Sequence, residues 1–155
     1  MGSDSDLPVV EASFSILDDF GVKYTKNVMS AHRTPHDVME LIKNSEENGC
    51  KVFIAAAGMA AHLAGAVAAH STKPVIGIPI ESGGMGGIDS LLSTAMMPPG
   101  VPVATVAVGK SGAKNSAILA VQILATSDED LAQKLVEYKQ NMRSEVLEKD
   151  KKLNS

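Results

Sequence analysis

A histidine and an arginine stand side by side in the stretch Ser30–Pro35, which reads SAHRTP. An imidazole can give and take a proton near neutral pH, and a guanidinium offers forked donors that suit a phosphate. His32 and Arg33 together therefore indicate acid–base chemistry on an anionic substrate. The alternative for His32 is a structural histidine satisfied by its neighbours, which is the commoner role of a lone histidine.

The stretch Gly2–Asp6 (GSDSD) is small, rich in hydroxyl groups and followed by a predicted helix. Backbone N–H groups at a helix N-terminus suit a phosphate, and the hydroxyls of Ser3 and Ser5 would add donors. Asp6 could accept a hydrogen bond from a ribose hydroxyl. Helix capping explains one Ser or Asp here but not the whole run.

The stretch Ala57–Leu63 (AGMAAHL) carries almost no side-chain bulk. Small residues let a ligand lie against the backbone. The ring of His62 either faces such a ligand or has a packing role, and the sequence does not decide between them.

Other suggestive stretches fail as motifs. The run Gly109–Ser111 (GKS) ends like a P-loop, but the motif needs glycine at position 104, where Ala104 stands. The run Gly83–Gly87 is rich in glycine without dinucleotide-binding spacing. No His, Cys or carboxylate pair has metal-ligand spacing on a helix face. With two Tyr, three Phe and no Trp, little can stack on a flavin. We therefore expect no metal and no cofactor.

The elements that position these residues alternate along the chain. Helices and strands are identified by hydrophobic periodicity and by helix-ending Gly and helix-starting Pro residues. We expect helices at Pro8–Phe20 (capped by Asp6), Thr34–Gly49, Ala60–Ser71, Ile88–Met97, Ala113–Thr126 and Asp128–Lys149, and strands at Lys23–Met29, Lys51–Ala57, Pro74–Ile80 and Val101–Val108. Such alternation predicts a parallel sheet between two helical layers, a three-layer α/β/α sandwich in one domain over residues 1–155 with an extra long C-terminal helix.

In open α/β sheets ligands bind at the carboxyl ends of the strands. The loops Gly2–Asp6, Ser30–Pro35, Ala57–Leu63 and Glu81–Asp89 all hold that position. We therefore expect them to converge. The first of them looks like the turn after a strand, yet the chain opens on a helix, so we expect a central first strand to be missing upstream of Met1.

The bulk composition narrows the class of protein. A net charge of -4 argues against a general nucleic-acid or anionic-membrane surface. The one cysteine, Cys50, excludes an internal disulfide and indicates a reducing compartment. The start lacks the charged and apolar regions of a secretory signal, and the apolar stretch Val52–Ala69 is mostly Ala and Gly with His62 in it. We expect a cytoplasmic enzyme with no membrane partner.

Taken together, these segments resemble the class I family of 5-(carboxyamino)imidazole ribonucleotide mutases in purine biosynthesis. The resemblance rests on MGSDSD from Met1, SAHRTP from Ser30, SEENG from Ser45, AAAGMAAHLAG from Ala55, KPVIGIPI from Lys73, GIDSLLS from Gly87 and MPPGVPVATVAVGKSGAKNSAILAVQIL from Met97. It covers nearly the whole chain, and the order and spacing of the segments are very specific.

The resemblance implies a flavodoxin-like fold, a homo-octamer with sites shared between neighbouring subunits, and no cofactor. It implies that His32 is the general acid and base, and that Ser3, Asp6 and Arg33 bind the phosphate and ribose of the nucleotide. The pocket for the imidazole and carboxylate would be lined by Ser30, Gly58, Ala60, Ala61, His62 and Leu63. The ATP-dependent synthetase that makes the substrate is a further candidate partner.

Two alternatives to the mutase stay open. One is the related carboxylase, which takes free carbon dioxide; the SAHRTP form, without Lys after His32, favours the mutase. The other is a non-catalytic nucleotide-binding module, which would keep Ser3, Asp6 and Arg33 and give His32 no task. The loop Ser82–Gly87 is richer in glycine than the family pattern, which makes pocket closure and retention of carbon dioxide the properties in question.

The Ala- and Gly-rich stretches Ala60–Ala69 and Ala113–Ala125 have few large side chains for a monomeric core. Close packing between subunits would explain them, so we expect a homo-oligomer. The C-terminal helix, with Leu131, Leu135, Tyr138 and Met142 at helical intervals, either packs on a neighbour or is a solvated surface helix.

Overall fold

The computed structural model describes residues 1–154 of the chain. Its centre is a parallel sheet of three strands in the order β1-β2-β3, formed by β1 (Phe53–Gly58), β2 (Val75–Ile80) and β3 (Ala104–Thr105). Every residue of β2 is buried. A strand covered on both faces reads as a continuous apolar run, which is why VIGIPI and FIAAAG could be recognised as strands.

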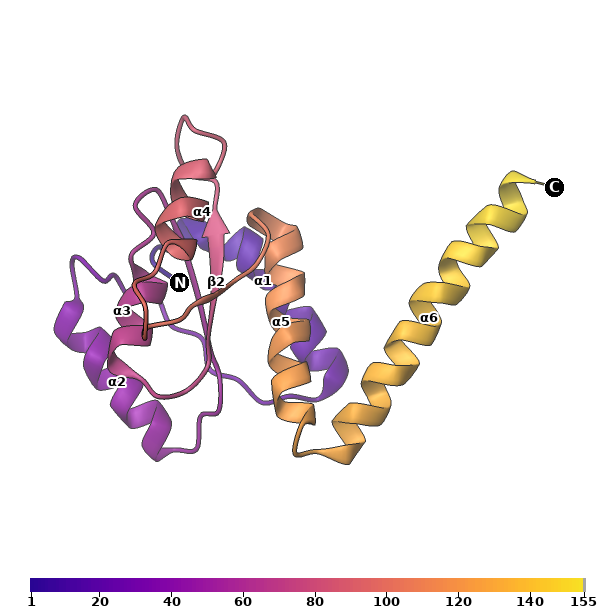
Figure 1. The fold of residues 1–155 in the computed structure, drawn as a ribbon, viewed down its shortest axis with the longest axis horizontal. Helices are drawn as coiled ribbons and strands as arrows, with labels where there is room; N and C mark the ends of the chain where they lie inside the picture. The colour runs from indigo at the N-terminus through magenta and orange to yellow at the C-terminus, as the bar shows by residue number, and fades with distance from the viewer. Residues whose placement is uncertain (155) are drawn as a thin grey trace.

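Helices cover both faces of the sheet (Figure 1). Their bounds are α1 (Leu7–Phe20), α2 (Pro35–Glu47), α3 (Leu63–His70), α4 (Ile88–Ala95), α5 (Gly109–Ala125) and α6 (Glu129–Leu153), with a short 3₁₀ helix, η1 (Asp4–Asp6), before α1. Successive residues of β1 face opposite layers, as strand geometry requires. Ala55 packs with α2 and α3, whereas Ala56 packs with α1 and α5. The predicted three-layer α/β/α arrangement is confirmed.

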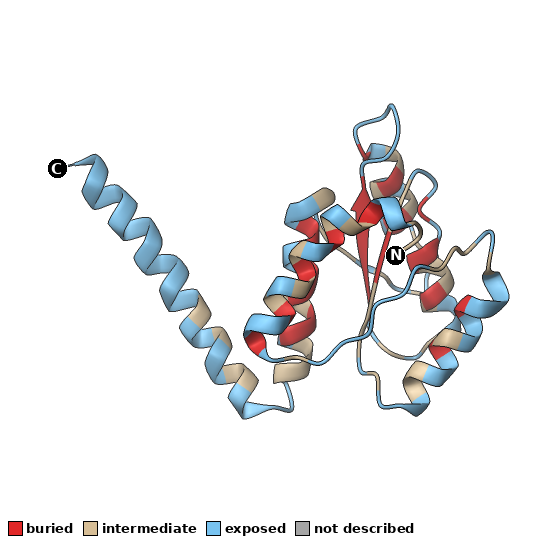
Figure 2. Ribbon diagram, turned by 180° about the vertical axis from the view of Figure 1, so that it is seen from behind, coloured by how far each residue is buried: buried red, intermediate tan, exposed pale blue. Residues whose placement is uncertain are grey.

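Both helical layers pack closely because small residues line them. Gly77 of β2 has no room for a side chain, since a Cβ there would lie 2.3 Å from Thr94 Cγ2 and 3.3 Å from Ala64 Cβ. On the other face Ser13 of α1 donates a hydrogen bond of 2.8 Å to the carbonyl of Ala113. The buried residues form a band through the middle of the body (Figure 2).

Two predicted strands are wrong in extent. The stretch Lys23–Met29 carries no regular strand, and the expected strand Val101–Val108 is reduced to Ala104–Thr105. For the first, the physical reason is the lack of a partner. Within residues 1–154 only Met1 forms backbone hydrogen bonds with this stretch, through its N–H on the Asn27 carbonyl and its carbonyl on the Met29 N–H, each 2.9 Å.

Met1 and Gly2 occupy a strand position between that stretch and β1. Gly2 donates from its N–H to the Ala56 carbonyl at 2.9 Å, while Met1 bonds the other neighbour in the pattern of a parallel bridge. Two residues thus hold the place where a longer central strand was expected. The rest of this edge of β1 forms no sheet pairing within the described residues.

The long helix α6 leaves the body after its first turns (Figure 1). Its residues Leu131, Leu135 and Tyr138 pack against Phe20 of α1 and its neighbours, and Tyr138 lies 5.6 Å from Phe20 between ring centres. No residue of α6 is buried. None of the helices in the described part of the chain combines the length and the apolar character needed to cross a membrane.

Candidate active site

A tight turn before α2 presents the His–Arg pair. The hydroxyl of Thr34 donates to the Ser30 carbonyl at 3.0 Å and accepts from the Ser30 N–H at 2.9 Å. The Ser30 hydroxyl in turn accepts from the Arg33 N–H at 3.2 Å. Thr34 stands at the cap position of α2, but its hydroxyl closes this turn and does not cap the helix. This leaves the side chains of His32 and Arg33 exposed.

The loop before α1 is held by a capping box around η1. The Asp6 carboxylate accepts from the Ser3 N–H at 3.0 Å, and the Ser3 hydroxyl accepts from the Ser5 N–H at 3.3 Å. Asp6 makes no side-chain cap to α1, contrary to expectation. Burial raises the pKa of the Asp6 carboxyl above its usual range, and the hydrogen bond from Ser3 partly opposes this. In this conformation Asp6 stabilises the loop rather than facing solvent.

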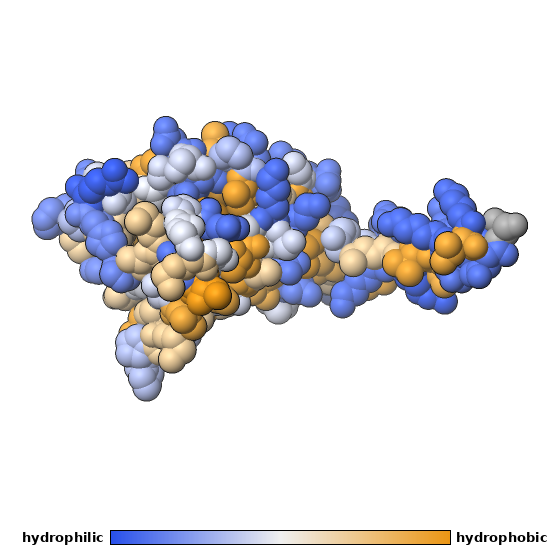
Figure 3. Space-filling view, turned by 90° about the horizontal axis from the view of Figure 1, so that it is seen from above, coloured by the Kyte–Doolittle hydropathy of each residue, from blue (hydrophilic) through white to orange (hydrophobic). Residues whose placement is uncertain are grey.

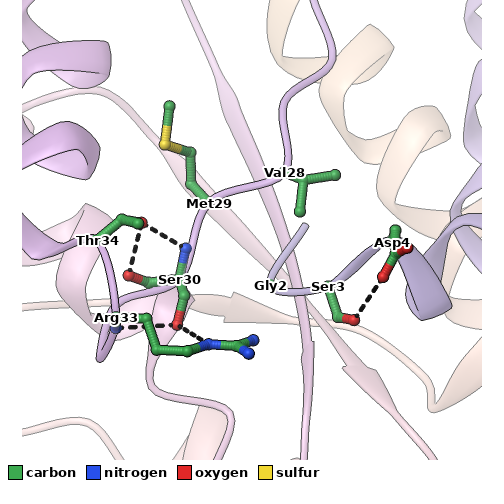
Figure 4. A pocket seen from close by; sticks show the side chains of 8 residues that line it. All are labelled: Gly2, Ser3, Asp4, Val28, Met29, Ser30, Arg33 and Thr34. Atoms are coloured by element: carbon green, nitrogen blue, oxygen red, sulfur yellow. Dashed lines mark hydrogen bonds between the residues drawn. The ribbon is translucent and has the colours of Figure 1, made fainter.

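These two turns form the walls of one cavity of about 350 Å³, a size that suits a small ligand (Figure 4). Its lining residues are Gly2, Ser3, Asp4, Val28, Met29, Ser30, Arg33 and Thr34. The Arg33 side chain extends from its turn toward Ser3, with Nε donating to the Ser30 hydroxyl at 3.4 Å. Within residues 1–154 no carboxylate forms an ion pair with Arg33, so one positive charge and several hydroxyls are available to a phosphate.

The turn after β1 is strained. Met59 and Ala61 have φ values of 54° and 39°, in the left-handed region that side chains disfavour. Each such residue costs on the order of 1–3 kcal/mol and is found disproportionately at functional sites. The turn follows Gly58. This position requires glycine because a Cβ there would lie 1.8 Å from Ser82 Oγ. The exposed backbone of the turn is therefore positioned by packing beneath it.

The strained turn brings His62 onto His32. Nε2 of His32 lies 2.6 Å from Nδ1 of His62, and the two rings meet edge to face with centres 4.8 Å apart. A hydrogen bond between two imidazoles needs a proton on one nitrogen and a lone pair on the other. One of the two facing nitrogens must therefore carry a proton, and either ring can be the donor. The sequence left the role of His62 open, and the structure places it beside His32.

Not every expected residue lines the cavity. Of the expected set, Ser3, Ser30 and Arg33 do. Those that do not are Asp6, His32, Gly58, Ala60, Ala61, His62 and Leu63. The side chains of Ala61 and Leu63 are buried, so this turn can offer a ligand its backbone and the side chains of Met59, Ala60 and His62.

Sequence reasoning missed four lining residues other than glycine, namely Asp4, Val28, Met29 and Thr34. Asp4, Met29 and Thr34 adjoin residues that were singled out, and Val28 directly precedes Met29, so their positions were the available signal. Nothing in their side chains set them apart. Among residues 1–154 no group of three His, Cys, Asp or Glu side chains is placed to hold a metal ion.

Comparison with known proteins assigns the family. The model of the AIR carboxylase family matches residues 1–145. The chain belongs to the AIR carboxylase family. A relative from Thermotoga maritima, named N5-carboxyaminoimidazole ribonucleotide mutase, is 51% identical over 153 residues, covering 99% of this chain and 88% of that protein. A Bacillus subtilis protein of the same name is also 51% identical, with coverage of 99% and 94%.

Solved structures of this family share the fold. The crystal structure of Treponema denticola PurE superposes with a TM-score of 0.91 at 31% identity, covering 100% of this chain and 96% of that one. The flavodoxin-like architecture implied by the resemblance is thereby confirmed. In this member of the AIR carboxylase family, the loops that contain Ser3, Ser30–Arg33 and Gly58–His62 lie at the edge of the sheet where the strands end.

Proposed function

We propose that this protein is an N5-carboxyaminoimidazole ribonucleotide mutase, an isomerase of purine biosynthesis that moves a carboxylate from the exocyclic nitrogen to ring carbon 4. The observation that carries the proposal is the His32–His62 pair, 2.6 Å between nitrogens, beside a cavity that contains Arg33 and three hydroxyl side chains. Relatives at about half identity over nearly the whole chain carry this activity in their names.

The nucleotide would be held by its phosphate. Arg33 supplies a charge-assisted donor and Ser3 and Ser30 supply hydroxyls, all at one cavity. Asp6, next to this cavity in the chain, would reach a ribose hydroxyl once the loop gives up its internal bond to Ser3. The imidazole and its carboxylate would then lie toward the exposed backbone of the Gly58–His62 turn.

In the first step His32 gives its proton to the exocyclic nitrogen. The N–carboxyl bond breaks, its electron pair stays on nitrogen, and the products are carbon dioxide and the aminoimidazole nucleotide. General acid catalysis of this kind contributes on the order of 10²–10⁴-fold. Keeping the freed carbon dioxide beside the ring contributes more, because the second step is then effectively intramolecular.

In the second step ring carbon 4 attacks the carbon dioxide and forms the new carbon–carbon bond. The displaced ring proton returns to His32, so the product is 5-amino-4-imidazolecarboxylate ribonucleotide and the enzyme is restored. His62 supports this cycle because its Nδ1 holds the orientation of the His32 ring. No ATP, metal or other cofactor enters the balance.

The carboxylase acting on free carbon dioxide is the second candidate, and the description of the matching family model favours it. Incubation of the protein with each substrate, without ATP, separates the two. The mutase predicts rapid conversion of the carboxyamino nucleotide and little product from aminoimidazole ribonucleotide with bicarbonate at low concentration. Faster turnover of the second mixture would establish the carboxylase.

A nucleotide-binding module is the third candidate. Its mark would be nucleotide binding that Arg33→Ala abolishes, together with product formation from neither mixture above the uncatalysed rate. The mutase proposal would then fail while the binding site stood.

We further propose a cytoplasmic homo-octamer whose subunits share their sites. Support comes from exposed apolar side chains in two places: Ile88 and Leu92 on α4 with Met96 directly after it, and Met142 and Val146 on α6. Figure 3 shows hydrophobic side chains exposed on the body and on the outer part of α6. Patches of this kind mark interaction surfaces. The ATP-dependent synthetase that supplies the substrate is a candidate partner, and light scattering of the protein alone and mixed with it tests both proposals.

A further inference from the structure

The carboxylate of Asp89, in the first turn of α4, lacks a partner on one side. Its Oδ1 is buried and accepts no hydrogen bond, and it is the only such side-chain atom within residues 1–154. A buried acceptor without a donor is costly, and more so when it is charged. Native structures seldom leave such a group unpaired without a functional reason.

Unused donors lie next to it, in the glycine-rich loop Gly83–Gly87. Within the described part of the chain no amide of this loop donates a hydrogen bond. Oδ2 of Asp89 lies 3.5 Å from the place where a Cβ of Gly83 would be, so the carboxylate borders the start of the loop. Gly84 and Gly86 have nothing within 4 Å of their Cβ positions, and Met85 is 62% exposed. The loop therefore has room to move and amides to offer.

The residue before this loop contacts the start of the turn that carries His62. Ser82, just before it, fills the space that a side chain on Gly58 would need. The loop beyond Ser82 stands out from the body between β2 and α4 (Figures 1 and 2). A movement of this loop would therefore begin next to the strained turn that carries His62, because Ser82 lies against Gly58.

We infer that Asp89 is a positioning residue that latches the glycine-rich loop closed over the site when nucleotide binds. In the closed state amides of Gly83–Gly87 donate to Oδ1 of Asp89, which removes the cost of the unpaired buried oxygen. Glycine at these positions lets the amides turn inward. This inference rests on the proposed function, because the closed loop serves to keep the freed carbon dioxide beside the ring.

The test uses the full chain, substrate labelled with ¹³C in its carboxyl group, and unlabelled bicarbonate in the buffer. Label retained in the product measures how often carbon dioxide stays in the site. Wild type keeps most of the label, and Asp89→Ala loses it, with the ratio of escape to recapture rising on the order of tenfold. Asp89→Asn, which keeps a carbonyl acceptor, lies between them.

Hydrogen exchange provides a readout that does not depend on turnover. Binding of aminoimidazole ribonucleotide slows amide exchange of the peptide Ser82–Gly87 in wild type but not in Asp89→Ala. The control is Asp130→Ala, which removes an exposed carboxylate from the first turn of α6. We expect it to behave as wild type in both measurements. The melting temperature of each variant, and its mass by light scattering, show whether the variant folds and assembles as wild type does.

The outcomes separate the two claims. If wild type does not convert the labelled substrate at all, the proposed function fails. If wild type converts it and Asp89→Ala retains label and loop protection equally well, the latch is overturned. Loss of both in Asp89→Ala, with partial rescue by Asp89→Asn, supports it.

Discussion

Gly58, the last residue of β1, is packed so closely that a single methyl group would disturb the site. A Cβ at this position would lie 1.8 Å from Ser82 Oγ, 2.7 Å from Ser82 Cβ and 3.1 Å from the Ile80 carbonyl oxygen. The Ser82 hydroxyl can rotate away, but its Cβ moves only with the backbone. Gly58→Ala therefore has to push the start of the glycine-rich loop away from the strained turn.

Overpacking of this kind costs about 1–3 kcal/mol. For a chain of this size each kcal/mol lowers the melting temperature by roughly 2–4 °C, so we expect a loss of ~2–12 °C. Activity should fall further than stability does, because the displaced turn also carries His62. Thermal unfolding followed by circular dichroism gives the first quantity, and kcat/KM for the carboxyamino nucleotide gives the second.

A second substitution isolates the cause. Ser82→Gly removes both offending atoms, so the double variant Gly58→Ala/Ser82→Gly should regain most of the lost stability, apart from the close approach to the Ile80 carbonyl. Gly84→Ala is the matched control, since nothing lies within 4 Å of its Cβ position. If Gly58→Ala melts with wild type, or if Ser82→Gly does not rescue it, the packing argument is wrong.

Three further predictions follow from the same geometry. Arg33→Ala should weaken nucleotide binding by about 10–100-fold with kcat little changed, because a charged hydrogen bond is lost. Calorimetric titration measures the affinity for the nucleotide, and an unchanged affinity would show that Arg33 is not part of the phosphate site. Asp6→Asn should raise the melting temperature near pH 7, because burial raises the pKa of Asp6 and so the folded state favours its protonated form. That gain should shrink as the pH falls toward the ordinary carboxyl range, and a gap that does not vary with pH would contradict it. We also propose that strand-forming residues placed before Met1 would fill the open position beside β1; scanning calorimetry should show a higher melting temperature for them than for a Gly/Ser extension of equal length.

The layers and the order of the elements were predictable because their signals are local. The buried runs FIAAAG and VIGIPI and the Pro and Gly at helix ends can be read without knowing the neighbours. The stretch Lys23–Met29 was not predictable in this way. Its residues suit a strand, but whether a strand forms depends on a partner elsewhere in the chain, and in the described part of the chain Met1 is the only backbone partner.

The site was predictable in its loops but not in its contacts. Positions at the strand ends led to Ser3, Ser30 and Arg33, and the structure brings these three to one cavity. The contact between His32 and His62 depends on left-handed φ values at Met59 and Ala61, which their residue types disfavour. Likewise the unpaired oxygen of Asp89 has no counterpart in the sequence pattern. Backbone strain and unsatisfied groups are properties of the folded chain.

The central claim is that one imidazole, at position 32, carries the proton in both steps. It is tested most directly by His32→Asn, assayed for conversion of the carboxyamino nucleotide without ATP and, in parallel, for nucleotide affinity. Asparagine keeps polar contacts but cannot exchange a proton, so kcat should fall on the order of 10²–10⁴-fold while affinity stays near that of wild type. A variant that binds the nucleotide and turns it over at the wild-type rate would contradict the account.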